Sequence, residues 1–293
     1  FISRNRMMDR TNEIPHDPVD ARQFELNVKQ LADSLTFGPD DSIYHGSGIE
    51  YSQSRVYEPG DSVKLIDWRI SARTDRLFVK EYQEPRQVPL YLLLDTSASM
   101  CVSSRPLSKY AYAIRFAAAI ALAAQSRLMP VGLVTCGDRR MRISPTLSGN
   151  DVMQWAHQLR RHGYREQTLL GQRVRELMPT LKRRSSLIVL SDLHDGDAVP
   201  ALRLVAQQHD CMVLHFRDPA ESNLRGAGIF RAREAESGRS FHATGRRKWF
   251  DRESVRRSLT RQHIDYLLLQ TDGPMVAPLR AFLKARGGAL EAR

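Results

Sequence analysis

The stretch VPLYLLLDTSASM, residues 88–100, decides the expected fold of this chain. Its apolar part has the length of a strand buried on both faces, as in a parallel α/β sheet, and is too short for a membrane helix. Asp95 ends the apolar run, and Ser97 and Ser99 follow it. Because α/β folds bind ligands at the carboxyl ends of their strands, and short oxygen donors suit hard cations, these three residues form a candidate Mg²⁺ site. Helix capping and turn formation are the alternative roles.

A strand and helix alternation continues beyond this stretch. A helix is expected over residues 107–127, then the apolar strand VGLVTCG with MRIS as its hairpin partner, then a helix over about 151–161 capped near Asn150. Further strands are expected at three apolar runs, SLIVLSD, CMVLHF and YLLLQT, with a helix before the first and a last helix near 275–286. This alternation predicts a doubly wound, mostly parallel sheet with helices on both faces.

The chain before residue 88 has a different pattern. Residues 18–35 predict a helix, since apolar residues recur there at helical spacing. The following residues are rich in turn formers and short alternating runs, which indicates a smaller β-rich lobe. We therefore expect an N-terminal helical segment (1–36), a β-rich lobe (37–87) and an α/β domain (88–293) with a hairpin insertion near 226–243.

Composition is that of an ordinary globular chain, with 293 residues, 42% of them hydrophobic and 26% charged. The Ala-rich segment 110–124 contains Arg115, so no membrane span is expected, and residues 1–10 lack the apolar core of a signal peptide. The three cysteines have no paired spacing, which favours a cytoplasmic location. The net charge of +11 suits nucleic acid or an acidic protein surface, and a solvated basic surface is the alternative.

A second acid strengthens the candidate metal site. The apolar run SLIVLSD ends in Asp192, and neighbouring parallel strands would bring Asp95 and Asp192 to the same edge. Two adjacent carboxylates repel each other unless a cation lies between them. Thr168, in the loop between, is a candidate further donor or an ordinary loop threonine. His194 and Asp195 are either supporting groups or an exposed turn.

Several strings resemble known families. DTSAS resembles the DxSxS signature of von Willebrand factor A domains, and VGLVTCGDRRMRI and LIVLSD resemble later strands of that fold. The string RVYEPGDSVKLIDWRISART, residues 55–74, resembles the bacterial domain-of-unknown-function 58 family encoded beside MoxR-type AAA ATPases. DPAE (218–221) and LQTDGP (269–274) fit the same family.

The resemblance implies a von Willebrand A type of fold and a metal-ion-dependent adhesion site. Its ligands would be Asp95, Ser97 and Ser99 in the first loop, Thr168 in the second and Asp192 in the third. It implies a non-catalytic interaction module in which Mg²⁺, or Mn²⁺, accepts an acidic side chain of a client protein. A MoxR-type AAA ATPase is the implied partner, in chaperone-like assembly or maturation of a complex.

The charged residues of the string over 55–74 suggest a structural role. We expect four of its residues to form a network around Trp68 that pins the lobe to the α/β domain, namely Arg55, Asp61, Asp67 and Arg73. Partner recognition is the alternative.

Enzyme motifs are absent from the sequence. It has no phosphate loop of the type GxxxxGK[ST], no GxGxxG after a strand and no GxSxG elbow, so no catalytic residues are expected. A Mg²⁺-dependent phosphotransferase with a strand-end Asp nucleophile remains an alternative, although the second acid of such sites is replaced here by Ser97. A nucleic-acid-binding module is the other alternative.

Overall fold

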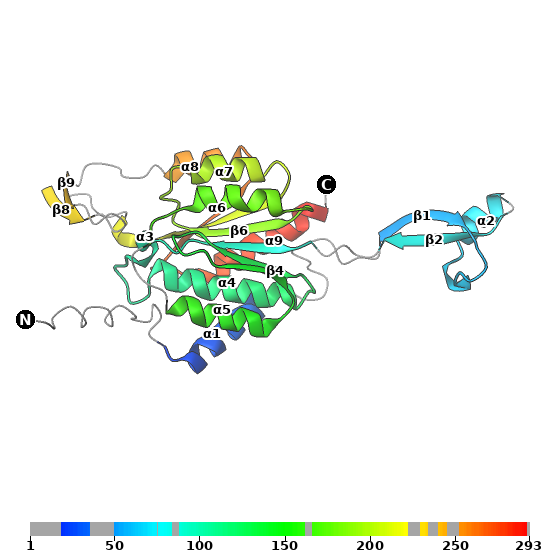
Figure 1. Ribbon diagram of the computed structural model, residues 1–293, viewed down its shortest axis with the longest axis horizontal. Helices are drawn as coiled ribbons and strands as arrows, with labels where there is room; N and C mark the ends of the chain where they lie inside the picture. Colours follow the sequence, from blue (N-terminus) through cyan, green and yellow to red (C-terminus); the bar gives the residue numbers. More distant parts are fainter. Residues whose placement is uncertain are drawn as a thin grey trace, which may run out of the picture.

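A computed structural model describes residues 19–35, 50–74, 76–83, 88–161, 166–221, 229–233, 240–244 and 252–291. Its centre is a six-stranded sheet with the order β10-β7-β6-β3-β4-β5 (Figure 1). The strands are β3 (Leu90–Leu94), β4 (Val131–Thr135), β5 (Arg142–Thr146), β6 (Ser186–Ser191), β7 (Asp210–Arg217) and β10 (Asp265–Gln270). Only β5 runs antiparallel to its neighbour, because it returns from β4 as a hairpin. The predicted α/β class with a mostly parallel sheet is confirmed.

The middle of the sheet is apolar on both faces. Every residue of β3, β4 and β6 is buried, and Leu92 lies in register between Leu133 and Ile188. Burying a leucine side chain contributes about 1.5–3 kcal/mol, so these short runs stabilise the sheet without any polar alternation. This is the pattern expected where helices cover both faces.

Helices cover the two faces of this sheet and form two separate cores (Figure 1). One face carries α1 (Ala21–Leu35), α4 (Lys109–Gln125), α5 (Gly149–Arg160) and α9 (Val276–Glu291). The other carries α6 (Leu170–Leu177), α7 (Ala198–Val205) and α8 (Arg252–Thr260). Between α1 and α5, the Ala-rich α4 is buried on nearly all sides, as an almost wholly apolar helix requires.

Helix boundaries follow capping residues. The Ser108 hydroxyl accepts a hydrogen bond from the backbone N of Ala111 (3.1 Å) and begins α4. Ser148 accepts one from the backbone N of Asp151 (3.3 Å) and begins α5. The prediction of a cap near Asn150 was therefore two residues late, because the hydroxyl of the preceding serine reaches the free amide first.

Two small antiparallel ribbons complete the described structure. One pairs β1 (Glu50–Val56) with β2 (Phe78–Gln83) and carries η1 (Val63–Leu65) and α2 (Trp68–Thr74) at its far end. It stands apart from the large sheet in Figure 1. The other pairs β8 (Ile229–Arg233) with β9 (Ser240–Thr244), within the segment where a hairpin insertion was expected. Within the described residues, no helix is both long and apolar enough to cross a bilayer.

Of the charge network expected around Trp68, the pair of Arg55 and Asp61 is confirmed and the role of Asp67 was wrong. Arg55 pairs with Asp61 through two contacts of 2.6 and 2.7 Å. Asp67 instead accepts hydrogen bonds from the first backbone amides of α2 and from the Ser54 hydroxyl (3.0 Å). Its oxygens are therefore used in capping α2, and this leaves Trp68 on the outer side with 66% of its surface exposed. The motif builds the lobe itself, and these contacts do not join it to the sheet.

Candidate metal centre at the carboxyl edge of the sheet

The loop after β3 is folded around a buried carboxylate. Asp95 is fully buried, and its Oδ1 accepts a hydrogen bond from the backbone N of Ser97 (3.0 Å). Its Oδ2 accepts one from the Ser191 hydroxyl at the end of β6 (2.5 Å). The hydroxyls of Ser97 and Ser99 lie 2.9 Å apart. Although Ser97 precedes the short helix α3 (Ala98–Cys101), its side chain makes no capping hydrogen bond, so the hydroxyl pair faces the site instead.

Asp192 joins this loop from the neighbouring strand, as the strand-end argument predicted. It follows β6, which pairs in parallel with β3, and its side chain is also buried. Burial and then the negative charge of Asp192 raise the pKa of Asp95 to about 7, against opposing hydrogen bonds from the two serines. The edge thus holds two carboxylates that a cation would stabilise together.

A buried lysine lies at the same edge, and the sequence did not single it out. Lys109 Nζ is 2.7 Å from Asp192 Oδ2 and also contacts the Glu221 carboxylate, while its side chain is 1% exposed. Burial acts to lower the lysine pKa, but the two carboxylates outweigh it and the pKa is raised. For Asp192, burial acts to raise the pKa, and Lys109 holds it below its usual value. A lone lysine at the head of an otherwise Ala-rich helix was the available signal.

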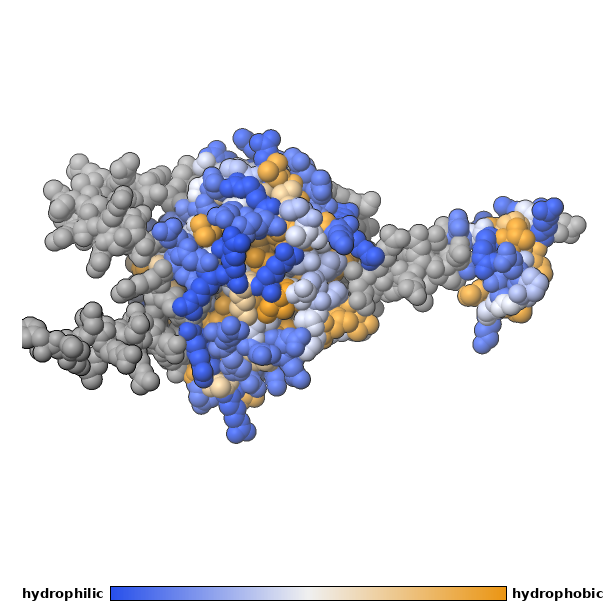
Figure 2. All heavy atoms as spheres, in the orientation of Figure 1, coloured by the Kyte–Doolittle hydropathy of each residue, from blue (hydrophilic) through white to orange (hydrophobic). Residues whose placement is uncertain are grey.

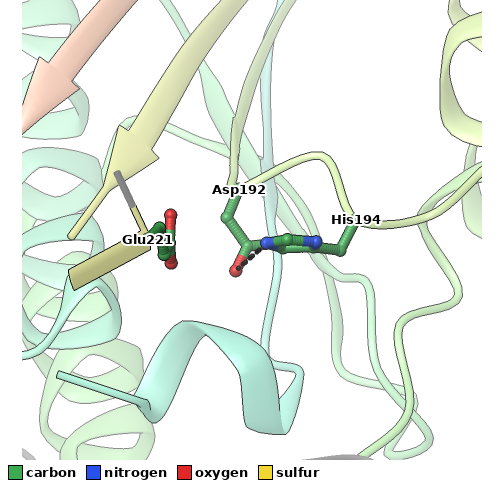
Figure 3. A group of neighbouring side chains, drawn as sticks. All are labelled: Asp192, His194 and Glu221. Carbon is green, nitrogen blue, oxygen red and sulfur yellow. Dashed lines mark ion pairs between the residues drawn. The ribbon is translucent and has the colours of Figure 1, made fainter. Parts of the chain in front are cut away.

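Two further groups reach Asp192. His194 Nε2 is 3.8 Å from Asp192 Oδ2, and Glu221 comes from η3 (Pro219–Glu221), just after β7. Figure 3 shows the His194 ring turned back toward the Asp192 carboxylate from the same loop, with Glu221 on the other side. One ligand atom from each of the three residues lies within 4.8 Å of the others, a spacing compatible with one metal ion. His194 is thus a neighbour of the site. Glu221 is another, although no role had been predicted for it from the DPAE string.

The segment that carries Thr168 lies beside the first loop. The backbone N of Ala98 donates to the backbone O of Glu166 (2.8 Å), and the Thr96 hydroxyl donates to Glu166 Oε2 (2.7 Å). Thr168 itself is partly buried. The tertiary structure therefore brings together the three loops that carry the expected ligands, while the ligand role of Thr168 stays a prediction.

Asp195 holds the loop after β6 in place through hydrogen bonds to backbone amides. Asp195 Oδ2 accepts a hydrogen bond from the backbone N of Gly171 (2.8 Å), and Oδ1 accepts one from the backbone N of Asp197 (2.8 Å). A Cβ on Gly171 would lie 2.6 Å from the backbone O of Asp197, so this close approach requires glycine. Asp195 thereby fixes the loop that carries Asp192 against the start of α6.

Asp218, directly after β7, is a third strand-end acid that sequence reasoning left without a role. It accepts hydrogen bonds from the Ser103 hydroxyl (3.1 Å), from the backbone N of Ser104 (2.9 Å) and from the Ser104 hydroxyl (2.5 Å). These bonds keep its pKa low even though burial acts to raise it. Asp218 therefore anchors the loop before α4.

The surroundings of Asp192 Oδ1 indicate whether a cation fits this edge. Asp192 Oδ1 is buried and has no hydrogen-bond partner within the described part of the chain. A buried carboxylate oxygen left in this way costs free energy unless something positive approaches it. The donors around it are carboxylate and hydroxyl oxygens, which suit a hard divalent cation. The residues present therefore fit a Mg²⁺-type ion.

Fold and site together define a mixed α/β domain with an acid and hydroxyl centre at the carboxyl edge of its sheet. The profile of the family described as "Protein of unknown function DUF58" matches residues 53–264, and the chain belongs to this family. The expected family membership is confirmed, and the association with MoxR-type ATPases stays a prediction.

Two curated relatives are bacterial proteins. The chain is similar to Rv1480 of Mycobacterium tuberculosis, with 29% identity over 225 residues, 74% of this chain and 70% of the relative. It is also similar to YeaD of Bacillus subtilis, with 33% identity over 76 residues, 26% of this chain and 19% of the relative.

Two solved structures are also similar to the chain. The SpRpn10 VWA domain gives a TM-score of 0.41 at 10% identity, covering 66% of this chain and 93% of that one. An uncharacterized membrane spanning protein from Vibrio fischeri gives a TM-score of 0.21 at 17% identity, covering 69% and 97%.

Proposed function

We propose that this protein is a non-catalytic, metal-dependent protein-interaction module. Its binding centre is the carboxyl edge of the sheet, and the residues that would hold Mg²⁺ or Mn²⁺ are Asp95, Ser97, Ser99, Thr168 and Asp192. The observation that carries the proposal is the buried Asp192 Oδ1, which has no hydrogen-bond partner among the described residues and belongs to the same edge as the two hydroxyls.

The chemistry of the donors favours capture of a carboxylate. When bound, the cation supplies an electrophilic position that an acidic side chain of another protein can fill. The serine hydroxyls are neutral, so they leave more of the cation's charge for that carboxylate than further acids would. Asp95 is held in place by Ser97 and Ser191, which limits the reorganisation needed on binding.

The identity of the partner is a proposal from resemblance. The string over residues 55–74 resembles proteins encoded beside MoxR-type AAA ATPases, so such an ATPase is the proposed partner in chaperone-like assembly or maturation of a complex. The net charge of +11 favours an acidic client protein and would speed its encounter with the site.

The phosphotransferase alternative finds less support in the geometry. The second acid of such sites is replaced here by Ser97, and the Asp95 side chain is fully buried. A nucleophilic carboxylate needs an oxygen directed at its substrate. The nucleic-acid alternative rests on net charge alone.

The test is a capture experiment on the intact chain with and without Mg²⁺. The purified protein is immobilised, and the candidate ATPase and acidic client proteins from the native extract are quantified after washing. We expect Asp95→Ala to abolish Mg²⁺-dependent capture and Asp272→Ala to leave it unchanged, since Asp272 is an exposed acid after β10. Thermal melts establish that both variants fold. Equal Mg²⁺-dependent capture by a folded Asp95→Ala variant would overturn the proposal.

A further inference from the structure

The lobe formed by β1, β2, η1 and α2 exposes large apolar side chains. Five of the eleven exposed large hydrophobic side chains in the described structure belong to it: Val56, Val63, Leu65, Trp68 and Leu77. Trp68 and Val63 are 66% and 62% exposed. Isolated exposed apolar residues are ordinary, but a group concentrated on one small element marks a contact surface.

Basic side chains accompany this apolar group. Lys64, Arg69, Arg73 and Arg76 are all exposed, and none forms an ion pair with a described residue. Asp67, within the same stretch, is buried and occupied with capping α2. In sequence, residues 63–77 contain four basic residues and two acids, Asp67 and Asp75. The surface between residues 63 and 77, which we call the tip, therefore combines apolar groups with an excess of positive charge, and Figure 2 shows hydrophobic and hydrophilic surface side by side on this lobe.

Side-chain hydrogen bonds fix the conformation of the tip. The two contacts between Arg55 and Asp61 close the turn that leads into η1, and Gly60 allows its positive φ of 115°. The Asp67 cap then fixes the start of α2. In Figure 1, η1 and α2 lie at the end of the ribbon away from the large sheet. These contacts hold Trp68 and the arginines outward.

The tip and the metal centre belong to opposite ends of the sheet. The lobe precedes β3 in the chain and so leads into the amino end of that strand, while Asp95 follows its carboxyl end. Binding at the tip would therefore leave the Asp95 edge free, and the two surfaces can be tested separately.

We infer that the tip docks on an anionic lipid bilayer. Its tryptophan and aliphatic side chains would insert at the level of the headgroups, and the four basic side chains would lie among lipid phosphates. The charge and the apolar groups together favour this occupant. A second copy of the chain is disfavoured by repulsion, because each copy carries a net charge of +11. A bilayer also needs no matching pocket, which suits side chains spread over a protruding turn.

The experiment is co-flotation of the intact protein with vesicles. Vesicles of equal parts phosphatidylglycerol and phosphatidylcholine are compared with vesicles of phosphatidylcholine alone, at low and high salt. We expect binding to the anionic vesicles only, weakened by salt. Arg69→Gln with Arg73→Gln should lower the partition coefficient roughly 25-fold, about fivefold for each charge removed from the surface of the bilayer.

A matched pair controls for general loss of charge. Arg183→Gln with Arg184→Gln removes two exposed arginines that lie between η2 (Met178–Thr180) and β6, and it should change the partition little. Trp68 provides an insertion signal, because brominated lipid should quench fluorescence in the wild type and much less in Trp68→Phe. Circular dichroism establishes that each variant is folded.

Three results would overturn the inference. The first is no flotation with anionic vesicles, and the second is an equal loss for both arginine pairs. The third is a loss of protein capture by the tip variants when the wild type binds no vesicles. That result would make the tip a protein-docking surface.

Discussion

Lys109 Nζ lies 2.7 Å from Asp192 Oδ2, and both side chains are almost completely buried. The carboxyl edge of the sheet therefore contains a positive charge of its own, fixed at the first residue of α4. The ammonium satisfies one oxygen of Asp192 and leaves Oδ1 without a hydrogen-bond partner in the described structure. A divalent ion at Asp95 and Asp192 would bind against the repulsion of this ammonium.

Replacing the lysine tests that competition. We expect Lys109→Met to tighten Mn²⁺ binding about tenfold or more, since even two unit charges 4 Å apart repel by roughly 4 kcal/mol at an effective dielectric constant near 20. Without metal, the same variant leaves Asp192 without its charge partner and should lose about 3–5 kcal/mol of stability. Titration of Mn²⁺ followed by electron paramagnetic resonance measures the first effect, and urea unfolding in chelator measures the second.

Lys109→Arg is the matched control, because it keeps the charge and should not tighten binding. If folded Lys109→Met bound Mn²⁺ no better than wild type while Asp95→Ala abolished binding, the competition would be wrong and the metal centre would stand.

The pKa of Asp95 predicts how stability changes with pH. Its folded value, raised to about 7 by burial and by Asp192, lies above the unfolded value, so the folded state binds the extra proton between the two. The stability contributed by this proton is complete below the unfolded pKa and is lost as the pH rises through about 7. In chelator, Asp95→Asn should therefore be more stable than wild type above pH 7, and the difference should shrink in acid.

Unfolding in urea across this range measures the difference. Adding Mg²⁺ above pH 7 should stabilise wild type and not Asp95→Asn. A difference between the two proteins that stays constant with pH would contradict the assignment.

A substitution at Gly171 should affect the metal centre by moving the loop after β6. In Gly171→Ala the new Cβ would meet the backbone of Asp197 at 2.6 Å, so the loop that Asp195 ties to α6 must shift. We expect a loss of about 1–3 kcal/mol of stability, as for other overpacked sites, with weaker Mn²⁺ binding although no ligand is changed. Gly196→Ala is the control, because its Cβ would meet nothing within 4 Å. Equal effects of the two substitutions would contradict this role for Gly171.

The central strand predicts a large stability effect of a single residue. Leu92 is fully buried between β4 and β6, so Leu92→Ala should cost about 2–5 kcal/mol in urea unfolding. Leu26→Ala, on an α1 residue that is 46% exposed, should cost much less. A Leu92→Ala cost no larger than that of Leu26→Ala would show that β3 is not at the centre of the core.

Local sequence was enough to predict the sheet and one pair of its acids. Apolar runs of strand length gave β3, β4, β6, β7 and β10, and helical spacing gave the buried face of α1. Asp95 and Asp192 were expected at one edge because parallel neighbouring strands end together, and the structure confirms that relation. These features depend on periodicity and on chain direction, which are written in consecutive residues.

What only the tertiary structure decided is the partner of each charge. Lys109 meets Asp192 across 83 positions of sequence and Glu221 across 112, and its place at the head of an Ala-rich helix does not identify either partner. The same limit explains Trp68, which the sequence placed inside a charge network and the structure leaves exposed, because Asp67 bonds to the amides of α2 instead. The sequence by itself determined the apolar strands of the large sheet, several of its helices and its strand-end acids, since burial of apolar runs follows local pattern. It did not predict α7 or α8. The charge balance of the edge was decided by folding, because Coulomb interactions depend on distances that only the packed chain sets.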